Sequence, residues 1–242
     1  MSSGSGGVLI FKGMKVSILA GDLSIGISDN GEFSSHCILS TSYNVIPIWM
    51  KIAHDNLRQS RIASEAILEK WSEDADFQKQ LLMGELAPSM QVIVACGIAL
   101  DALYDTLRPY AKITPEEIES WKKNKTARAK QIVEIIKRAY KLKPDIFNNF
   151  KECISEIIKL RDKAVHPSLE LQNVCGRSDI DVAVDWKFAV YRYENAKRVF
   201  INTGNIIAYL YEHKSNINEL DEALFNIIEA LKELGIISSK SD

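Results

Sequence analysis

The chain has 242 residues, of which 46% are hydrophobic and 26% are charged, as is usual for a folded globular protein. The net charge of −2 excludes a protein whose whole surface binds polyanions, so any contact with nucleic acid must come from a local basic patch. The length predicts one large domain, or one domain with a small appendage.

The N-terminal part is expected to form a β appendage. Residues 1–13 begin with MSSGSGG and are predicted to be a flexible lead, without the apolar segment of a secretion signal. Residues 14–43 are predicted to form an antiparallel meander of three strands, with tight turns at Gly21-Asp22 and Asn30-Gly31. One face of it would carry the alternating apolar residues Val16, Ile18, Leu23, Ile25, Ile27, Phe33, Cys37 and Leu39. A meander of this size is not expected to be stable alone, so we expect it to pack on the helices that follow.

Residues 44–242 are expected to form a helical bundle, which makes the predicted fold class mainly α with a small N-terminal β meander. Pro88 is predicted to begin a helix that is apolar nearly all round and therefore central. Its longest apolar run is about half of a membrane span, which predicts a protein in solution in the cytoplasm. Thr114 and Glu117 predict a capping box. The helices are expected at residues 44–71, 76–86, 88–110, 114–121, 126–142, 145–165, 185–214 and 218–234.

No metal or cofactor is expected. The cysteines Cys37, Cys96, Cys153 and Cys175 form no CxxC pair and are predicted to be small buried side chains in a reducing compartment. His36, His54 and His213 have no companion at the spacing of metal ligands. No phosphate-binding glycine loop, dinucleotide fingerprint or nucleophile elbow is present.

The segment IIKLRDKAVHPSLE, residues 157–170, breaks the helical pattern. Stepping 100° per residue places Arg161 at the centre of the apolar stripe that Phe147, Phe150, Ile154, Ile157, Ile158 and Val165 form. A guanidinium there is costly unless it is paired, and residues that break a local rule are candidates for function. Because His166 precedes Pro167, the helix is expected to end at residue 165 or 166, and the break would let the imidazole turn toward Arg161. An arginine and a histidine suit phosphodiester chemistry, the first holding charge and the second moving a proton. The simpler alternative is that Arg161 pairs with an acid of a neighbouring helix and that His166 caps a helix end.

The sequence LRDKAVHP, at the end of a long helix in an all-helical domain, resembles the HEPN (higher eukaryotes and prokaryotes nucleotide-binding) family. That family's signature is an arginine, four to six residues and a histidine, often with Asn, Asp or His after the arginine; Arg161, Asp162 and His166 match it. The resemblance covers roughly residues 45–235. It implies a homodimer with two Arg–His pairs in a cleft, and metal-independent cleavage of RNA to a 2′,3′-cyclic phosphate. It also implies a toxin or antiviral effector with a possible antitoxin or defence-complex partner. Pro167-Ser168 replace the tyrosine found in toxins that pair with nucleotidyltransferase antitoxins, which argues against that pairing.

A basic segment offers candidate RNA contacts. Residues 122–143 carry nine Lys or Arg and one acid, and the best candidates for phosphate contacts are Lys122, Lys123, Lys125, Arg128 and Lys130. A solvated helix face is the alternative, since Ile132, Ile135, Ile136 and Tyr140 fit a core-facing stripe. Residues 186–200 interleave aromatics with arginines, which would suit base stacking. Core packing is expected instead, because Trp186, Val190, Tyr193 and Phe200 follow helical spacing. Residues 167–185 either form a plain surface loop or shape the cleft.

The function predicted first is therefore a homodimeric ribonuclease in which Arg161 stabilises the phosphate, His166 is the general base or acid, and Asp162 orients the site. Two alternatives stay open. One is a non-catalytic helical module that binds a protein partner or a nucleotide with the same face. The other is a structural bundle that docks into a larger complex through its β appendage.

Overall fold

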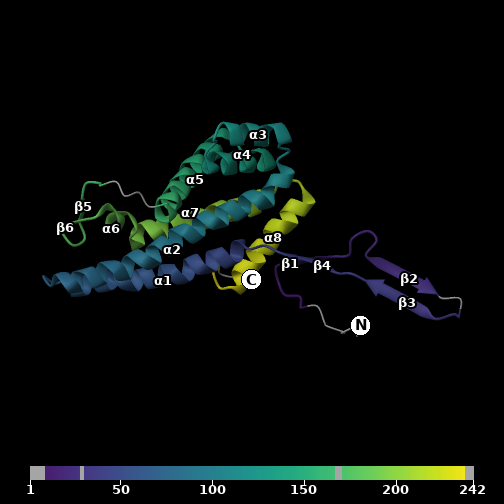
Figure 1. The fold of residues 1–242 in the computed structure, drawn as a ribbon, viewed down its shortest axis with the longest axis horizontal. Coiled ribbons are helices and arrows are strands. Elements are labelled where there is room, and N and C mark those ends of the chain that lie inside the picture. Colours follow the sequence, from purple (N-terminus) through teal and green to yellow (C-terminus); the bar gives the residue numbers. More distant parts are fainter. Residues whose placement is uncertain (1–8, 28–29, 167–170, 238–242) are drawn as a thin grey trace. The chain divides into compact units, whose positions relative to one another are not determined.

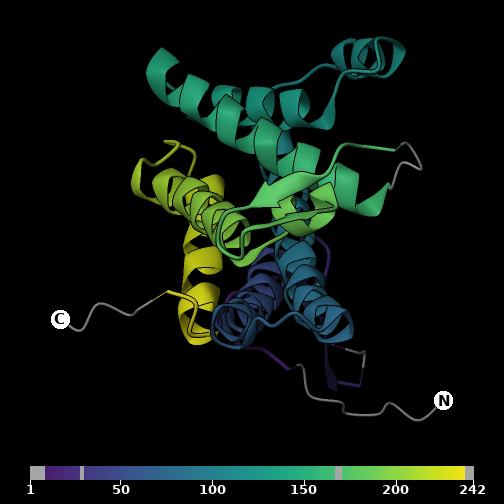
Figure 2. The ribbon, with the colours of Figure 1, turned by 90° about the vertical axis from the view of Figure 1, so that its left-hand side faces the viewer.

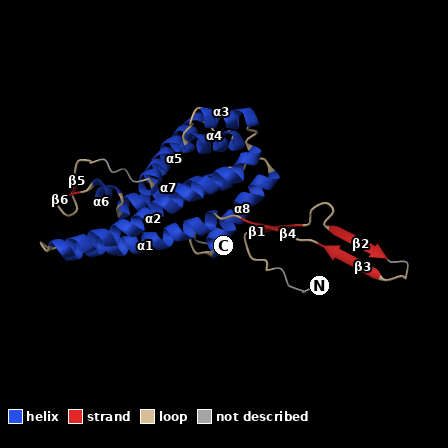
Figure 3. Ribbon diagram, viewed as in Figure 1, coloured by secondary structure: helices blue, strands red, loops and turns tan. Residues whose placement is uncertain are grey.

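The computed structural model describes residues 9–27, 30–166 and 171–237 (Figure 1). The chain divides into a β unit that ends at Asn44 and a helical unit that begins at Val45. Figure 3 shows strands in the first unit and mainly helices in the second. The predicted class, mainly α with a small antiparallel β element at the N-terminus, is confirmed.

The β unit is a nested hairpin, and the three-stranded meander was wrong. Its strands are β1 (Met14–Ser17), β2 (Leu23–Ile27), β3 (Phe33–Cys37) and β4 (Ser40–Tyr43); β2 pairs with β3, and β1 pairs with β4. Gly21-Asp22 does not reverse the chain between β1 and β2. The Asp22 amide donates to the Leu19 carbonyl at 3.0 Å and Gly21 has a φ of 91°, so this turn is a local excursion on one side of the ladder. The reversal occurs between β2 and β3, where Gly31 has a φ of 78°.

The inner ladder carries the predicted apolar face, but the unit leaves it exposed. Three cross-strand pairs form this face: Leu23 with Cys37, Ile25 with Ser35 and Ile27 with Phe33. The exposed fractions of Leu23, Ile25, Ile27 and Phe33 lie between 53% and 74%. The alternation of apolar and polar residues therefore predicted correctly which side chains share one face. No part of the β unit covers that face.

The helical unit is arranged around α2, the longest helix described. Figures 1 and 2 show α2 beside α1 along most of its length, and α4, α5 and α7 also contact α2. A short hairpin precedes α6. The elements are α1 (Ile46–Lys70), α2 (Ala75–Leu107), the 3-10 turn η1 (Arg108–Tyr110), α3 (Pro115–Lys123), α4 (Arg128–Tyr140), α5 (Pro144–Val165), β5 (Cys175–Arg177), β6 (Val182–Val184), α6 (Trp186–Val190), α7 (Tyr193–Glu212) and α8 (Asn218–Glu233).

Helix α2 corrects the predicted pair of helices at 76–86 and 88–110. Asp74 caps its start by accepting a hydrogen bond from the Phe77 amide, and Pro88 lies inside the helix. Proline removes one backbone hydrogen bond, and the carbonyl concerned belongs to Gly84. The helix continues because this segment is packed on α1: Pro88 and Ser89 are buried, and the Ser89 and Ser60 hydroxyls lie 2.6 Å apart.

The residues of α2 and η1, Ala75–Tyr110, form a helix long and apolar enough to cross a membrane by length and composition alone. This helix has 36 residues, whereas the longest apolar run in the sequence has nine. However, 56% of its most apolar window is buried within the unit, which is typical of the core helix of a bundle. Val92, Cys96, Leu100 and Leu103 are fully buried, so the predicted central position is confirmed.

Local signals fix the start of α3. The Thr114 hydroxyl accepts a hydrogen bond from the Glu117 amide at 3.3 Å, and the Glu117 carboxylate accepts one from the Thr114 amide at 3.0 Å, which confirms the capping box. Arg138 of α4 also binds Glu117, at 2.7 Å. This contact holds α3 on α4, and the Arg138 guanidinium lowers the pKa of the Glu117 carboxyl.

The single helix predicted for residues 185–214 is wrong, because the chain breaks between α6 and α7. Tyr191 fills the break and is 1% exposed. Its hydroxyl donates to the Leu160 carbonyl of α5 at 3.0 Å, and burial raises its pKa to about 12. The predicted core role of the aromatics holds for Trp186 and Phe200, which pack partly buried against the core.

Candidate functional site

The motif lies at the C-terminal end of α5. Ile154, Ile157 and Ile158 are buried as predicted, but Val165 is 43% exposed and is not part of the core stripe. The helix ends at Val165, and His166 leaves the helical region with φ −122° and ψ 73°. The His166 amide still donates to the Asp162 carbonyl at 2.8 Å, so the histidine follows the last turn closely.

Arg161 packs across α2 at Gly97. A Cβ atom added to Gly97 would lie 2.7 Å from Cγ of Arg161 and 2.9 Å from its Cβ, so only glycine permits this approach of the two helices. The guanidinium pairs with Asp101 of α2 through Nη2 at 3.1 Å and with Asp162 through Nε at 3.0 Å. The Arg161 side chain is 17% exposed, and this pairing is the one that the simpler alternative for Arg161 describes.

Asp101 joins this arginine to another. Arg128, at the start of α4, donates from Nε to Asp101 at 2.7 Å, and its guanidinium lies 3.7 Å from the centroid of the Tyr104 ring. The charge network thus runs Arg128–Asp101–Arg161–Asp162, with two positive and two negative side chains. Because these charges balance, Arg161 does not carry an uncompensated charge into the core.

A cavity of about 560 Å³ lies between the start of α4 and the last turns of α5. The lining residues from α5 are spaced by three or four positions and so share one stripe of the helix. His166 lies on this stripe with Asp162, and Arg161 does not line the cavity; the expected turn of the imidazole toward the arginine is therefore not observed. The described residues that line it are Ala127, Arg128, Ala129, Lys130, Ser155, Ile158, Lys159, Asp162, Lys163 and His166.

The cavity is positively charged. Lys130, Lys159 and Lys163 make no ion pair with any residue that the structure describes, and Asp162 is the one acid among the described lining residues. Lys163 lies 5.1 Å from the centroid of the Trp186 ring, which limits its freedom. A cavity with several lysines and one partly exposed histidine suits an anionic ligand with a transferable proton nearby.

The predicted RNA-binding residues separate into two groups. Arg128 and Lys130 line the cavity, next to His166 and Asp162. Lys122, Lys123 and Lys125 are exposed at the end of α3 and in the following link, and they do not line it. Lys122 is bound to Glu119 at 2.6 Å, as expected of a solvated helix face.

Four residues of the site were missed in the sequence: Gly97, Asp101, Lys159 and Lys163. Asp101 could have been predicted from the sequence. An acid in a helix that is apolar nearly all round needs a cationic partner, and Arg161, in an apolar stripe, needs an anionic one. The lysines had no such signal, since they lie on the polar face of α5 and become part of a site only when α4 packs beside them.

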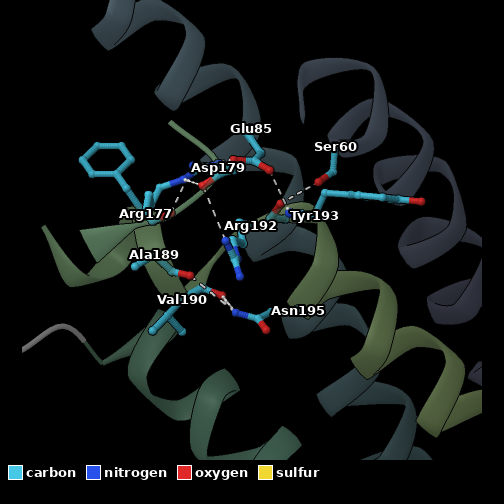
Figure 4. A network of polar contacts seen from close by, with 11 residues as sticks. Ser60, Glu85, Arg177, Asp179, Ala189, Val190, Arg192, Tyr193 and Asn195 are labelled. Atoms are coloured by element: carbon cyan, nitrogen blue, oxygen red, sulfur yellow. Dashed lines mark hydrogen bonds and ion pairs between the residues drawn. The ribbon is translucent and has the colours of Figure 1, made fainter. Parts of the chain in front are cut away.

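The described residues 171–185 are not a plain surface loop, because β5 and β6 are anchored to α2 (Figure 4). Arg177 donates to Glu85 of α2 at 2.7 Å, and the two side chains are 1% and 2% exposed. Arg177 also binds Asp179 and thereby lowers the pKa of that carboxyl. Glu85 accepts a second bond from the Tyr193 amide at 3.0 Å. None of the described residues of this segment lines the cavity; Pro167, Ser168 and residues 169–170 lie outside the described part.

The cysteines and histidines give no metal site within the described ranges, where no three potential ligands of the His, Cys, Asp or Glu type gather. Cys96 is buried, and burial raises its thiol pKa to about 12. The expectation that all four cysteines are buried was wrong, since Cys37 is exposed and Cys153 and Cys175 are half-buried.

Comparisons with models of known families, with curated proteins and with solved structures each found no match. The resemblance to the HEPN family therefore stays a prediction that depends on Arg161, Asp162 and His166.

Proposed function

We propose that this protein is a metal-independent endoribonuclease that acts in the cytoplasm as a homodimer, as a toxin or an antiviral effector. The observation that supports the proposal best is the single cavity in which His166 and Asp162 lie among Arg128, Lys130, Lys159 and Lys163. The three lysines, which make no ion pair with a described residue, attract a phosphodiester, and the histidine supplies the proton-transfer group that RNA cleavage requires.

In the proposed reaction, neutral His166 takes the proton of a ribose 2′-hydroxyl, and the 2′-oxygen attacks the adjacent phosphorus. The bond to the 5′-oxygen breaks, and a protonated His166 of the second copy supplies the proton to that oxygen. The products are a 2′,3′-cyclic phosphate and a 5′-hydroxyl, so atoms and protons balance. The lysines of the cavity hold the non-bridging oxygens while negative charge develops on them.

Arg161 takes part in this proposal through an exchange of partners. Its Nε atom is buried and makes no hydrogen bond, and it lies 3.0 Å from Asp162, whose side chain is 52% exposed. A phosphate that replaced the carboxylate would supply the hydrogen bond that the buried Nε lacks, at a side chain that is 17% exposed. Asp101 would keep the guanidinium in place during the exchange, since it binds the other end at 3.1 Å.

The decisive experiment is cleavage of a mixed RNA pool in excess EDTA by the wild type and by His166→Ala, with the mass of each measured by light scattering. His213→Ala is the matched control, because His213 also caps the end of a long helix, α7, and is exposed. Cleavage by a wild-type dimer and by His213→Ala, but not by His166→Ala, is expected. Intact RNA with folded dimeric wild type would contradict the proposal.

The exchange of partners has its own test. Asp162→Asn should strengthen RNA binding, because it removes both the charge that pairs with Arg161 and a negative charge from the lining of the cavity. Glu152→Gln on the same helix is the control for net charge, since Glu152 is exposed and makes no ion pair within the described residues. Equal binding by the two variants would show that Asp162 does not mask Arg161.

One observation favours the alternative of a non-catalytic module that binds a nucleotide or a protein partner. The guanidinium of Arg161 is neutralised by two carboxylates of its own chain and does not line the cavity. Tight binding of RNA that stays intact, with equal affinity for His166→Ala and His213→Ala, would support this second function.

A further inference from the structure

A second basic cavity lies on the helical unit, formed by α1 and α7. Its volume is about 420 Å³, and it is lined by His54, Leu57, Arg58, Arg61 and Tyr193. The four residues of α1 recur every three or four positions and so share one face of the helix. Of the five described lining residues three carry basic nitrogen atoms, and none is an acid.

Both arginines are available to a ligand. Arg58 is exposed and makes no ion pair with any residue in the described ranges. The Nε of Arg61 lies 3.7 Å from Glu65, and the two side chains are 57% and 60% exposed. A pair so long and so exposed is screened by solvent and contributes little, so Arg61 is readily drawn to a stronger anion.

The histidine has one nitrogen left for a ligand. The Nδ1 atom of His54 is buried and makes no hydrogen bond, and the nearest carboxylate oxygen, on Asp55, lies 3.5 Å away. That carboxylate is already bound by Lys51 at 2.6 Å, which lowers the pKa of Asp55. The ring also packs near Phe200, with centroids 6.0 Å apart. Hydrogen bonding by His54 is therefore restricted to Nε2.

Tyr193 adds a hydroxyl and an aromatic face. Its backbone amide is fixed by Glu85, and Figure 4 shows its ring extending away from that contact. Lys197 lies 5.6 Å from the ring centroid, while the hydroxyl makes no hydrogen bond to a described residue. With Leu57 beside it, the ring gives the cavity an apolar wall next to its donors.

We propose that this cavity binds a phosphate group. Two guanidinium forks and a phenolic hydroxyl provide donors, and arginine binds phosphate through paired hydrogen bonds that are roughly twice as strong as neutral ones. The volume lies within the range of small-molecule sites, and the apolar wall suits the sugar or base attached to the phosphate. The phosphate belongs either to a small nucleotide or to an RNA strand.

The two sources are separated by two probes, AMP and a fluorescein-labelled RNA of twelve nucleotides. Binding is measured in the His166→Ala background, which keeps the RNA intact and makes the result independent of the ribonuclease proposal. Arg58→Glu should weaken the probe that binds by about tenfold or more, as expected for loss of a charge-assisted hydrogen bond. Lys70→Glu, an exposed charge reversal in the last turn of α1, should leave it unchanged.

Weaker binding of AMP in Arg58→Glu identifies a nucleotide site, and weaker binding of RNA alone identifies contact with the strand. Arg58→Ala replaces Arg58→Glu if the latter unfolds at a lower temperature than Lys70→Glu. The proposal is overturned if neither AMP nor the RNA binds. It is also overturned if the substitutions at positions 58 and 70 change the affinity for each probe by the same factor.

Discussion

Replacing Gly97 by alanine tests the contact on which the site depends. The new Cβ would lie 2.7 and 2.9 Å from two atoms of Arg161 that are close to its backbone, so the clash cannot be relieved at the tip of a flexible side chain. Overpacking of this kind costs about 1–3 kcal/mol. Alanine recovers about 0.9 kcal/mol as a better helix former, which leaves a net change between roughly zero and 2 kcal/mol of destabilisation.

Gly84→Ala is the matched control on the same helix, because a Cβ there would meet nothing within 4 Å. This variant should gain about 0.9 kcal/mol. The two variants should then differ by about 1–3 kcal/mol in free energy of unfolding, or roughly 2–12 °C in Tm for a unit of this size. Urea and thermal unfolding measure the difference. Equal stability of the two variants would refute the close approach of α2 and α5 at Arg161.

Three further predictions concern stability. Glu85→Gln should lower the free energy of unfolding by about 3 kcal/mol in urea titrations, because it leaves the buried Arg177 charge without its partner on α2; a loss below about 1 kcal/mol would contradict this. The pKa of Asp179 is lowered in the folded state by Arg177, so its contribution is present above the ordinary value of 3.8 and lost as the pH falls through the lowered value. Wild type should therefore lose more stability than Asp179→Asn when the pH is taken below about 4. Parallel plots of the free energy of unfolding against pH for the two proteins would refute this. Thr114→Ala should cost about 1 kcal/mol and reduce hydrogen-exchange protection of the Glu117 amide, whereas unchanged protection would argue against the cap.

Some of the fold followed directly from local chemistry. The cap at Thr114, the helix end before Pro167 and the core positions Ile132, Ile135 and Ile136 are all set by neighbours in sequence. The interior position of Pro88 was not predictable in this way. Proline normally ends a helix, and here the packing of α1 on α2 outweighs that preference.

The candidate site, too, could be predicted from the sequence only in part. The helix end before Pro167 was expected to turn the imidazole of His166 toward Arg161, whereas His166 lines the cavity beside Asp162. The partner of Arg161 could not be chosen from the sequence, because Asp101 is sixty positions away and the choice depends on how α5 crosses α2. The strand pairing failed for a related reason, since the turn at Gly21 fits either a reversal or an excursion and only long-range pairing decides between them.

Helix α2 carries two anchors, Glu85 for the β5–β6 hairpin and Asp101 for the charge network behind the cavity. Sixteen residues separate them, which is about 24 Å along a helix axis. Because both residues belong to one helix, a displacement of α2 along its axis at one of these contacts would also displace the other. Pro88 lies between them and removes one backbone hydrogen bond of this helix, the bond to the Gly84 carbonyl. A change in the stiffness of α2 at that position would therefore alter how far the hairpin and the cavity move together.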